Sequence, residues 1–271
     1  TCPLQTNEVT FNSTTPRVGG QFDVSDDSNL YATYSKGFKV GGFNFSACNQ
    51  QFRPEKVTSY EAGWKNRLLD GSLILNLSAF YYDYTNLQLN QTVGLTSLIT
   101  NAAAARVKGI EAEATWRPEV HWTINGNLSL LRAKFTDFLN VDSLAPALGP
   151  QDVSGNYLRN APKTSANLGV AYHSDPLTFG GRITARADVS YRSKVYFREF
   201  NNPLDAQKSY VILNGSLIWD SPDERYRVRA FVTNITGEDY IVTMGSSDNF
   251  GSRFVSWGAP RQVGAELRVN F

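Results

Sequence analysis

Apolar and polar residues alternate along most of this chain. Between Leu73 and Tyr81 the odd positions are apolar, and the even positions include Asn76 and Ser78. The same alternation recurs in GIEAEATWRP, WTINGNLSLL, RITARADVSYR, YRVRAFV and RQVGAELRVNF. A period of two residues is typical of a β-strand whose two faces have different surroundings. Helical periodicity is not evident anywhere, so the pattern predicts an all-β, antiparallel fold.

Eleven strands follow from this alternation and from the turn signals that interrupt it. We expect them to start near Pro16, Leu30, Thr58, Ser72, Leu98, Trp122, Lys163, Gly181, Tyr210, Arg225 and Pro260. The segments between them alternate in length. SDDSN, LLDG, RPEV, SDPLTFG and SPDE are short and rich in turn-forming residues, whereas the segments around 40–56, 92–97, 139–162, 197–208 and 245–258 are treated as long loops. Short turns at one end and long loops at the other are typical of a transmembrane β-barrel.

The two faces of the predicted strands differ in a way that favours a wall between lipid and water. One strand places Arg182, Arg186, Asp188 and Arg192 on a single face, and such a row needs water or paired charges. The opposite rows are apolar but contain many Ala and Gly, which suit acyl chains better than the interlocking core of a sandwich. We therefore interpret the apolar rows as facing lipid and the charged rows as facing an aqueous interior. A soluble β-sandwich adhesin or lectin is the alternative outside membranes.

Aromatic residues on the apolar rows gather at two levels, as in the girdles of a transmembrane barrel. Near the short turns lie Phe22, Trp64, Trp116, Trp122, Tyr172, Trp219, Tyr226 and Phe271, and near the long loops lie Tyr34, Tyr81 and Tyr191. The eight steps from Leu73 to Tyr81 span about 26 Å along a strand, which nearly fills an apolar band of ~25 Å. Tyr60 fits this pattern less well, because it lies only four residues from Trp64.

The composition of the chain excludes several classes of function and structure. The chain of 271 residues carries 26 Lys and Arg against 25 Asp and Glu, so its net charge of +1 gives no reason to expect nucleic acid as a partner. It has no run of about 18 apolar residues, and no transmembrane helix is expected. The first residues lack the basic start and apolar stretch of a signal peptide, so either a signal was removed or the chain is an internal piece.

The chain contains few residues of the types that form metal sites or catalytic sites. The only cysteines are Cys2 and Cys48, and the two histidines, His121 and His173, lie far apart in sequence. No metal site of His and Cys and no cofactor are therefore expected. No nucleophile, base and acid occur at the spacing of a catalytic triad, and no nucleophile elbow is present, so we do not expect an enzyme.

An odd number of strands places the two ends of the chain on opposite sides of the membrane. Bacterial single-chain barrels have even strand numbers and both ends in the periplasm. We therefore expect the chain to be an open or incomplete barrel, the C-terminal part of a larger one. The terminal aromatic Phe271 resembles the signal that the outer-membrane assembly machinery reads.

Several stretches, in order, resemble one family. They are LYATYSKGFKVGGFN, FRPEKVTSYEAGWKNRLLDG, LNLSAFYYDYTNLQ, NAAAARVKGIEAEATWRP, FVTNITGEDY and APRQVGAELRVNF. Together they resemble the TonB-dependent receptors, the active transporters of the bacterial outer membrane. The resemblance implies a twenty-two-stranded barrel closed by an N-terminal plug domain. Residues 1–271 would form its last eleven strands, as a partial barrel domain that lacks the plug and the TonB-interacting segment.

The resemblance also implies a function and partners. The first expectation is uptake of a ferric siderophore, bound at the outer loops and released inward when TonB rearranges the plug. Expected partners are that ligand, TonB through the missing plug, outer-membrane lipids and the barrel assembly machinery. The alternatives are uptake of cobalamin, haem, other metals or oligosaccharides, a passive porin, and an outer-membrane enzyme.

Two predicted extracellular loops carry the candidate ligand contacts. These residues are Phe43, Asn44, Phe45, Gln51 and Arg53 in the first loop, and Tyr196, Arg198 and Phe200 in the second. Aromatic rings, amides and guanidinium groups suit a planar, anionic iron chelate. The alternative interpretation is that these side chains pack the loops against one another.

The remaining polar features are assigned to the barrel interior and to the loops. Predicted luminal residues are Glu111, Glu113, Arg117, Arg182, Arg186, Arg229, Glu266 and Arg268. They could dock the plug or pair across strands, and we favour ion pairing. Cys2 and Cys48 both fall on the long-loop side, where disulfides can form, and we predict a bridge between them. The alternative is that Cys2 pairs with a cysteine in the missing part of the barrel.

Overall fold

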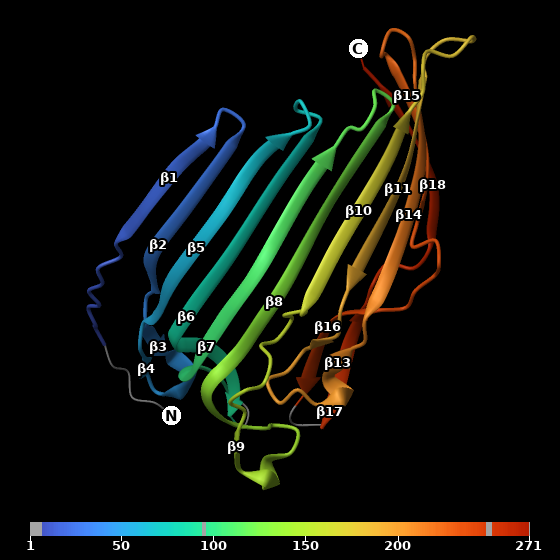
Figure 1. Ribbon diagram of the computed structural model, residues 1–271. Coiled ribbons are helices and arrows are strands. Elements are labelled where there is room, and N and C mark those ends of the chain that lie inside the picture. Colours follow the sequence, from blue (N-terminus) through green and yellow to red (C-terminus); the bar gives the residue numbers. More distant parts are fainter. Residues whose placement is uncertain (1–6, 94–95, 248–250, 271) are drawn as a thin grey trace.

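One curved antiparallel sheet dominates the computed structural model, which describes residues 7–93, 96–247 and 251–270 (Figure 1). Its strands follow one another in chain order: β1 (Arg17–Ser25), β2 (Ser28–Lys39), β5 (Glu55–Leu68), β6 (Leu73–Val93), β7 (Thr96–Trp116), β8 (Trp122–Val141), β10 (Thr164–His173), β11 (Arg182–Arg192), β14 (Tyr210–Asp220), β15 (Tyr226–Thr233) and β18 (Gln262–Val269). The eleven-strand prediction is confirmed. The largest difference in a strand start is at Thr58, where β5 already begins at Glu55.

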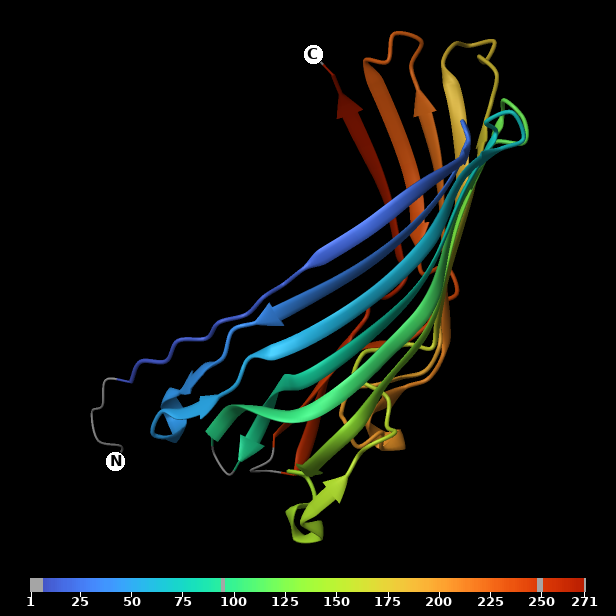
Figure 2. The ribbon, with the colours of Figure 1, turned by 60° about the vertical axis from the view of Figure 1, so that its left-hand side comes forward.

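The sheet is open. Its path runs from β1 to β18, and these two strands form its edges without pairing with each other. Figure 2 shows the sheet as a trough, with the short turns at the end where the C-terminus lies and the long loops at the other. We call these the short-turn end and the long-loop end. An all-β, antiparallel, incomplete barrel is therefore the observed fold, as predicted.

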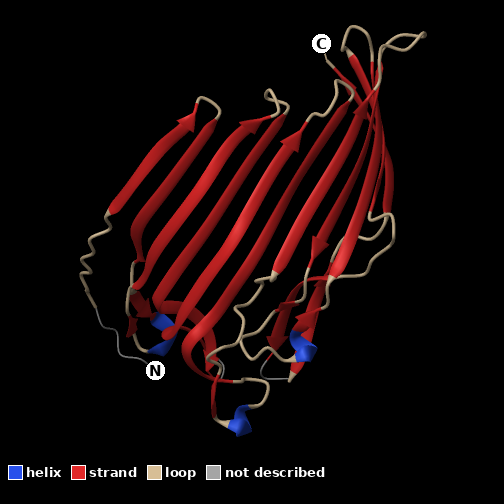
Figure 3. Ribbon diagram, viewed as in Figure 1, coloured by secondary structure: helices blue, strands red, loops and turns tan. Residues whose placement is uncertain are grey.

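The loops contain further short elements that the sequence pattern did not reveal (Figure 3). They are β3 (Gly42–Asn44), η1 (Phe45–Ala47), β4 (Gln50–Phe52), η2 (Pro146–Leu148), β9 (Pro150–Asp152), β12 (Val195–Tyr196), η3 (Pro203–Asp205), β13 (Ala206–Gln207), β16 (Ile241–Ser247) and β17 (Ser252–Trp257). β9 pairs with β8, while β3–β4, β12–β13 and β16–β17 are separate two-stranded ribbons. The three η elements are single-turn 3-10 helices, so the expectation of a chain without helix needs this small correction.

The expectation of a long loop around residues 92–97 is wrong. β6 continues to Val93 and β7 begins at Thr96, so the two strands form a tall hairpin beyond the girdle. The reason is packing, because Leu87 and Leu89 of β6 lie against a core at the long-loop end and strand pairing continues past them.

The apolar rows of neighbouring strands join into one continuous outer surface. Trp64 lies opposite Leu77, which lies opposite Ala112, which lies opposite Leu128. Leu128 is 40% exposed, and Ile110, Leu217 and Leu267 are more exposed still. A whole face of exposed large apolar side chains is what contact with acyl chains requires. Among the described residues, no helix is long and apolar enough to cross a membrane.

Aromatic side chains lie at two levels of this outer face, where the girdles are expected. At the short-turn end, the rings of Trp122 and Tyr172 lie 5.0 Å apart, and the Trp64 indole N–H donates to Ser28 Oγ at 2.8 Å. At the long-loop end, Tyr60 lies in register between Tyr34 and Tyr81. Tyr60 therefore lies in the same row as two predicted girdle residues, because strands that are staggered reach the same height at different distances from their turns.

Candidate functional site

The long-loop end of the sheet has its own small apolar core. Ala105, Phe135 and Phe138 are almost completely buried, and the two phenylalanine rings lie 5.0 Å apart. Ala103 and Val153 complete the buried set, and partly buried neighbours are Tyr84, Leu87, Leu89, Leu158 and Phe200. The core draws on β6, β7, β8 and two of the connecting segments, so this end is a packed layer that can hold side chains in fixed positions.

A buried ion-pair cluster ties three loops together. Arg198 is 8% exposed and donates to the carboxylates of Asp142 and of Asp205, the latter at 3.2 Å. Arg253 donates to the other oxygen of Asp205, which is fully buried. Asp142 follows β8, Arg198 and Asp205 lie between β11 and β14, and Arg253 lies in β17. We call these four residues the Arg198 cluster.

Arg198 stays charged in this setting. Burial alone lowers the pKa of its guanidinium, but the hydrogen bonds and charges of Asp142 and Asp205 outweigh that effect and raise the pKa of Arg198. A buried cation with two carboxylate partners is strongly held, because removing either partner leaves an uncompensated charge. The cluster thus fixes the three loops relative to one another.

Hydrogen bonds to backbone groups hold the β11–β14 loop further. The Asn201 side chain accepts from the backbone N–H of Tyr157 at 2.7 Å and donates to its carbonyl at 2.9 Å. Gln207 Oε1 accepts from the backbone N–H of Ile241 at 2.8 Å. This loop is therefore anchored on one side to the segment after β9 and on the other to β16.

The β2–β5 loop is fastened to the β6–β7 hairpin. The Asn44 side chain donates to the carbonyl of Ile99 and accepts from its N–H, both at 2.8 Å. The Asn101 side chain likewise donates to the carbonyl of Arg53 at 2.7 Å and accepts from its N–H. The loop is held at both ends in this way, while Phe45 at its tip is 86% exposed.

The five candidate ligand contacts of the first loop differ in accessibility. Asn44 is buried and uses its amide to brace β7, and Phe43 is half-buried. Phe45, Gln51 and Arg53 are exposed. The last three therefore present the side chains that a ligand could reach.

The three candidates of the second loop are less accessible. Arg198 is buried in its cluster, and its guanidinium also stands 5.3 Å from the centroid of the Phe200 ring. Tyr196 and Phe200 are half-buried, with Lys194 Nζ 4.5 Å from the centroid of the Tyr196 ring. Within the described residues, no hydrogen bond, ion pair or ring contact joins the candidates of the two loops. Both loops nevertheless contact the β6–β7 hairpin.

The partners of Arg198 are not evident from the sequence. Asp142 lies 56 positions from Arg198 along the chain, and Arg253 lies 48 positions from Asp205. Glu199, also nearly buried, pairs with Arg159 at 3.3 Å. Nothing in their spacing marks these residues, because the contacts depend on how separate loops meet.

The charged rows lie on the inner face, and part of the expected ion pairing is present. Arg229 pairs with Glu266 across β15 and β18 at 3.6 Å, and Arg186 pairs with Asp188 at 2.5 Å along β11. Glu111 accepts from Ser129 Oγ at 3.4 Å. For five of the predicted luminal residues no ion pair is found within the described part of the chain: Glu111, Glu113, Arg117, Arg182 and Arg268.

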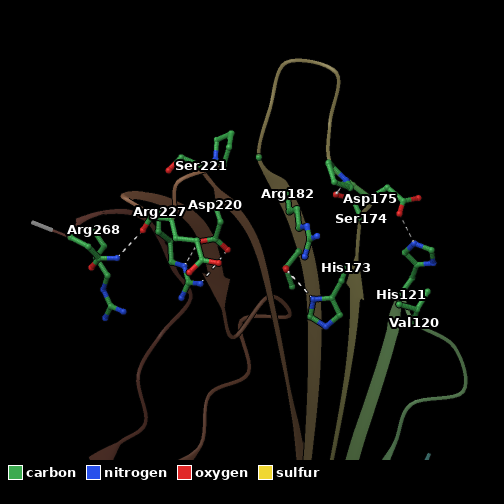
Figure 4. Close-up of a pocket in the computed structure, with 16 residues that line it drawn as sticks. Val120, His121, His173, Ser174, Asp175, Arg182, Asp220, Ser221, Arg227 and Arg268 are labelled. Carbon is green, nitrogen blue, oxygen red and sulfur yellow. Dashed lines mark hydrogen bonds and ion pairs between the residues drawn. The ribbon is translucent and has the colours of Figure 1, made fainter.

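A polar pocket opens on the inner face at the short-turn end (Figure 4). His121 Nε2 lies 3.2 Å from Asp175 Oδ1, and His173 Nδ1 lies 3.1 Å from Thr184 Oγ1. The pocket thus brings together the two histidines, which are far apart in sequence, and its other lining residues include Arg182, Arg227 and Arg268. Within residues 7–93, 96–247 and 251–270, no group of three or more His, Cys, Asp or Glu side chains could hold a metal ion.

Two predicted features fall outside the described residues. Cys2, one half of the predicted bridge to Cys48, lies in the segment 1–6, and Phe271 is the terminal residue. The disulfide and the assembly signal therefore stay predictions.

The sequence matches one protein family along most of its length. The family model described as TonB dependent receptor-like, beta-barrel, covers residues 3–235. The pesticin receptor of Yersinia enterocolitica is 30% identical over 255 residues, which are 92% of this chain and 34% of that protein. The ferric-pyoverdine 358 receptor of Pseudomonas putida is 26% identical over 268 residues, which are 95% of this chain and 29% of that protein. The chain thus spans only about a third of the length of the curated relatives it matches.

Solved structures support the same architecture. The ferric yersiniabactin uptake receptor of Yersinia pestis superimposes with a TM-score of 0.78 at 24% identity, over 94% of this chain and 37% of that one. The ferripyoverdine receptor of Pseudomonas aeruginosa superimposes with a TM-score of 0.66 at 19% identity, over 95% of this chain and 33% of that one. At these identities the likeness concerns the fold.

Proposed function

The chain belongs to the family of TonB-dependent receptor β-barrels, and we propose that it forms part of a receptor that takes up a ferric siderophore. Members of this family are transport receptors of the bacterial outer membrane. The outer apolar face of the sheet therefore lies in that membrane, with the long-loop end outside the cell and the short-turn end in the periplasm.

The observation that carries the ligand class is the match to a ferric-pyoverdine receptor along 95% of the chain. The exposed side chains of the candidate site are compatible with a ferric siderophore as ligand. Phe45, Gln51 and Arg53 offer an aromatic ring, an amide and a guanidinium as exposed side chains of the β2–β5 loop. Aromatic and cationic groups suit a ferric chelate with planar, anionic ligands.

In the proposed mechanism, this chain binds the ligand and the rest of the receptor releases it inward. Loops held by the Arg198 cluster and the apolar core form a rigid rim, which reduces the entropy lost when a ligand binds. A plug domain and a TonB-contacting segment, assigned to a part of the receptor beyond residues 1–271, would then release the ligand inward. The inner face described above would supply the wall against which the plug moves. Its periplasmic pocket contains Arg182 and Arg268, for which no ion pair is found among the described residues.

Uptake measurements on the full-length receptor test this proposal. Cells that lack the gene and cells complemented with it receive 55Fe bound to pyoverdine-type, yersiniabactin-type and catecholate siderophores under iron limitation. We expect at least one chelate to enter only complemented cells, and a protonophore to stop its entry. Protonophore-resistant uptake, together with steady conductance of the purified receptor in planar bilayers, would instead indicate a passive porin.

A further inference from the structure

The outer face carries a cluster of cations that begins in the tyrosine row, where Lys108 lies opposite Tyr81, and continues toward the long-loop end. Lys108 of β7 lies directly opposite Arg132 of β8, and two positions further on Arg106 lies opposite Lys134. With ~3.3 Å per residue and ~5 Å between strands, the four side chains start within roughly 7 by 5 Å. Together with the nearby Lys163, we call them the outer cation cluster.

Alternation along the strands places this cluster outside the barrel. Lys108 is two residues from Ile110 and Arg132 is two residues from Leu130, so each shares a face with an exposed apolar residue of the lipid-facing row. The guanidinium of Arg106 stands 5.8 Å from the ring centroid of Tyr81, a girdle residue. A ligand bound inside the barrel cannot reach these groups.

Like charges directly opposite each other destabilise a sheet. Anions close to these two cation pairs would reduce that repulsion. The protein supplies only part of the compensation. Arg106 Nε lies 3.6 Å from Asp83 Oδ1. Lys134 and Lys163 both stand near the ring of Tyr157, with 4.6 and 4.4 Å from their Nζ atoms to its centroid.

The central pair of the cluster lacks such compensation. Both Lys108 and Arg132 are exposed, and no carboxylate pairs with either within the part of the chain that the structure describes. Two cations held side by side on a rigid sheet, with no internal counter-charge, form a site for an external anion.

An apolar groove adjoins the cluster on the membrane side. The groove has a volume of about 450 Å³, and its lining combines Tyr81, Gly109, Ile110 and Leu130 with the cationic residues Lys108, Arg132 and Lys163. Its apolar floor belongs to the lipid-facing surface and its rim is positively charged. The fitting occupant has an anionic head and apolar tails.

The height of the cluster matches the head-group region. Lys108 is eight residues from Trp116 in the opposite girdle, a distance of about 26 Å along the strand. The usual tilt of barrel strands reduces this to a height of about 20 Å, close to the ~25 Å of the apolar band. The cations therefore lie where the hydrocarbon of the outer leaflet ends.

We propose that the outer cation cluster binds the phosphate groups of a phosphorylated lipid in the outer leaflet, whose acyl chains occupy the adjoining groove. The cation pairs Lys108–Arg132 and Arg106–Lys134 contact the phosphates, and Ile110 and Leu130 contact the chains. This inference depends on the membrane position of the barrel and is independent of the transported ligand.

The test is lipid binding by the full-length receptor in a neutral detergent, followed by native mass spectrometry. The probe is diphosphorylated lipid A, and the variant is K108Q/R132Q/K134Q. Because each cation near a lipid surface strengthens binding roughly fivefold, the triple variant should bind at least about tenfold more weakly than the wild type. The same glycolipid without phosphates should bind the wild type with a similarly reduced affinity.

The matched control is R117Q/R182Q/R268Q, which removes three exposed inner-face cations from the periplasmic end. We expect this control to bind diphosphorylated lipid A like the wild type. Equal loss in both triple variants, or equal binding of the glycolipid without phosphates, would overturn the proposal. Displacement of the lipid by an equal concentration of inorganic phosphate would show a free-anion site and would also overturn it. The thermal unfolding temperature of each variant verifies that it is folded.

Discussion

Tyr34 of β2 and Tyr60 of β5 lie directly opposite each other, with 5.2 Å between their ring centroids. Tyr60 also approaches Tyr81 of β6, at 6.3 Å. Three strands thus contribute one ring each to a continuous row on the outer face of the sheet. Rings of this type anchor a barrel because their apolar part contacts chains and their hydroxyl reaches the head groups.

Replacing Tyr60 with Ala should destabilise the full-length receptor in lipid vesicles by about 1–2 kcal/mol, because two ring contacts and the interfacial anchor are lost. Replacement with Trp should have a much smaller effect. Denaturant titration of unfolding measures both. Phe179→Ala serves as control, since Phe179 is exposed in a periplasmic turn without a described ring partner. Equal stability of the Ala and Trp variants would remove Tyr60 from the girdle.

Because Arg198 is held in its cluster, we expect Arg198→Met to lower mainly the local stability of the β11–β14 loop. The change leaves Asp142 and Asp205 buried without their shared cation, which should cost about 3–5 kcal/mol locally. Hydrogen–deuterium exchange of residues 193–209 should therefore accelerate strongly in the full-length receptor. Arg192→Met, which removes an exposed arginine of β11, should leave this exchange unchanged. Identical exchange in both variants would contradict the bracing role of the cluster.

For the exposed residues of the β2–β5 loop we expect the opposite: loss of ligand binding without loss of stability. Because Phe45 and Arg53 are exposed, Phe45→Ala and Arg53→Ala should leave the unfolding temperature unchanged and lower the affinity for the transported chelate, each by roughly tenfold. Equilibrium binding of the 55Fe-chelate to whole cells measures this. Val120→Ala, equally exposed at the periplasmic end, should bind normally. If both loop variants also bind normally, the loop is not part of the ligand site.

Gly63 is a close-approach position on the inner face. A Cβ at Gly63 would lie 2.3 Å from the ring of Tyr31, whose hydroxyl donates to Glu61 at 2.8 Å. Gly63→Ala should therefore displace this ring and destabilise the receptor by about 1–3 kcal/mol, as overpacking does. Gly20→Ala, also in a strand but with open space around it, should be neutral or slightly stabilising. Thermal unfolding compares the two, and equal effects would refute the packing argument.

The barrel strands could be predicted from the sequence because their environment repeats every two residues. The rows through Ile110, Leu128 and Leu217 each alternate with polar residues, so a local pattern carries the whole strand assignment. Tyr60 is an exception to this pattern for a related reason. Its height depends on the stagger between strands, which a count along one strand does not contain.

The loop site could be predicted only in part, because its contacts are non-local. Arg198 looked like a ligand contact as long as its two carboxylate partners were unknown. Phe135 and Phe138 were not singled out, since their burial depends on β7 and on the segment after β9 folding onto them. The residue types of the loops are visible in the sequence. Only the folded structure distinguishes the exposed Phe45 and Arg53 from the bracing Asn44 and Arg198.

Site-directed spin labelling tests the central claim, which is that the alternating apolar face touches lipid while its polar counterpart faces water. Nitroxides are attached at Leu128→Cys and at Asn127→Cys, adjacent residues of β8, in the full-length receptor without its native cysteines and reconstituted in lipid vesicles. The account predicts that the label at 128 collides with dissolved oxygen and is shielded from a water-soluble nickel chelate, and that the label at 127 shows the reverse preference. Equal accessibility of both labels to the nickel chelate, or shielding of both by surrounding protein, would contradict it.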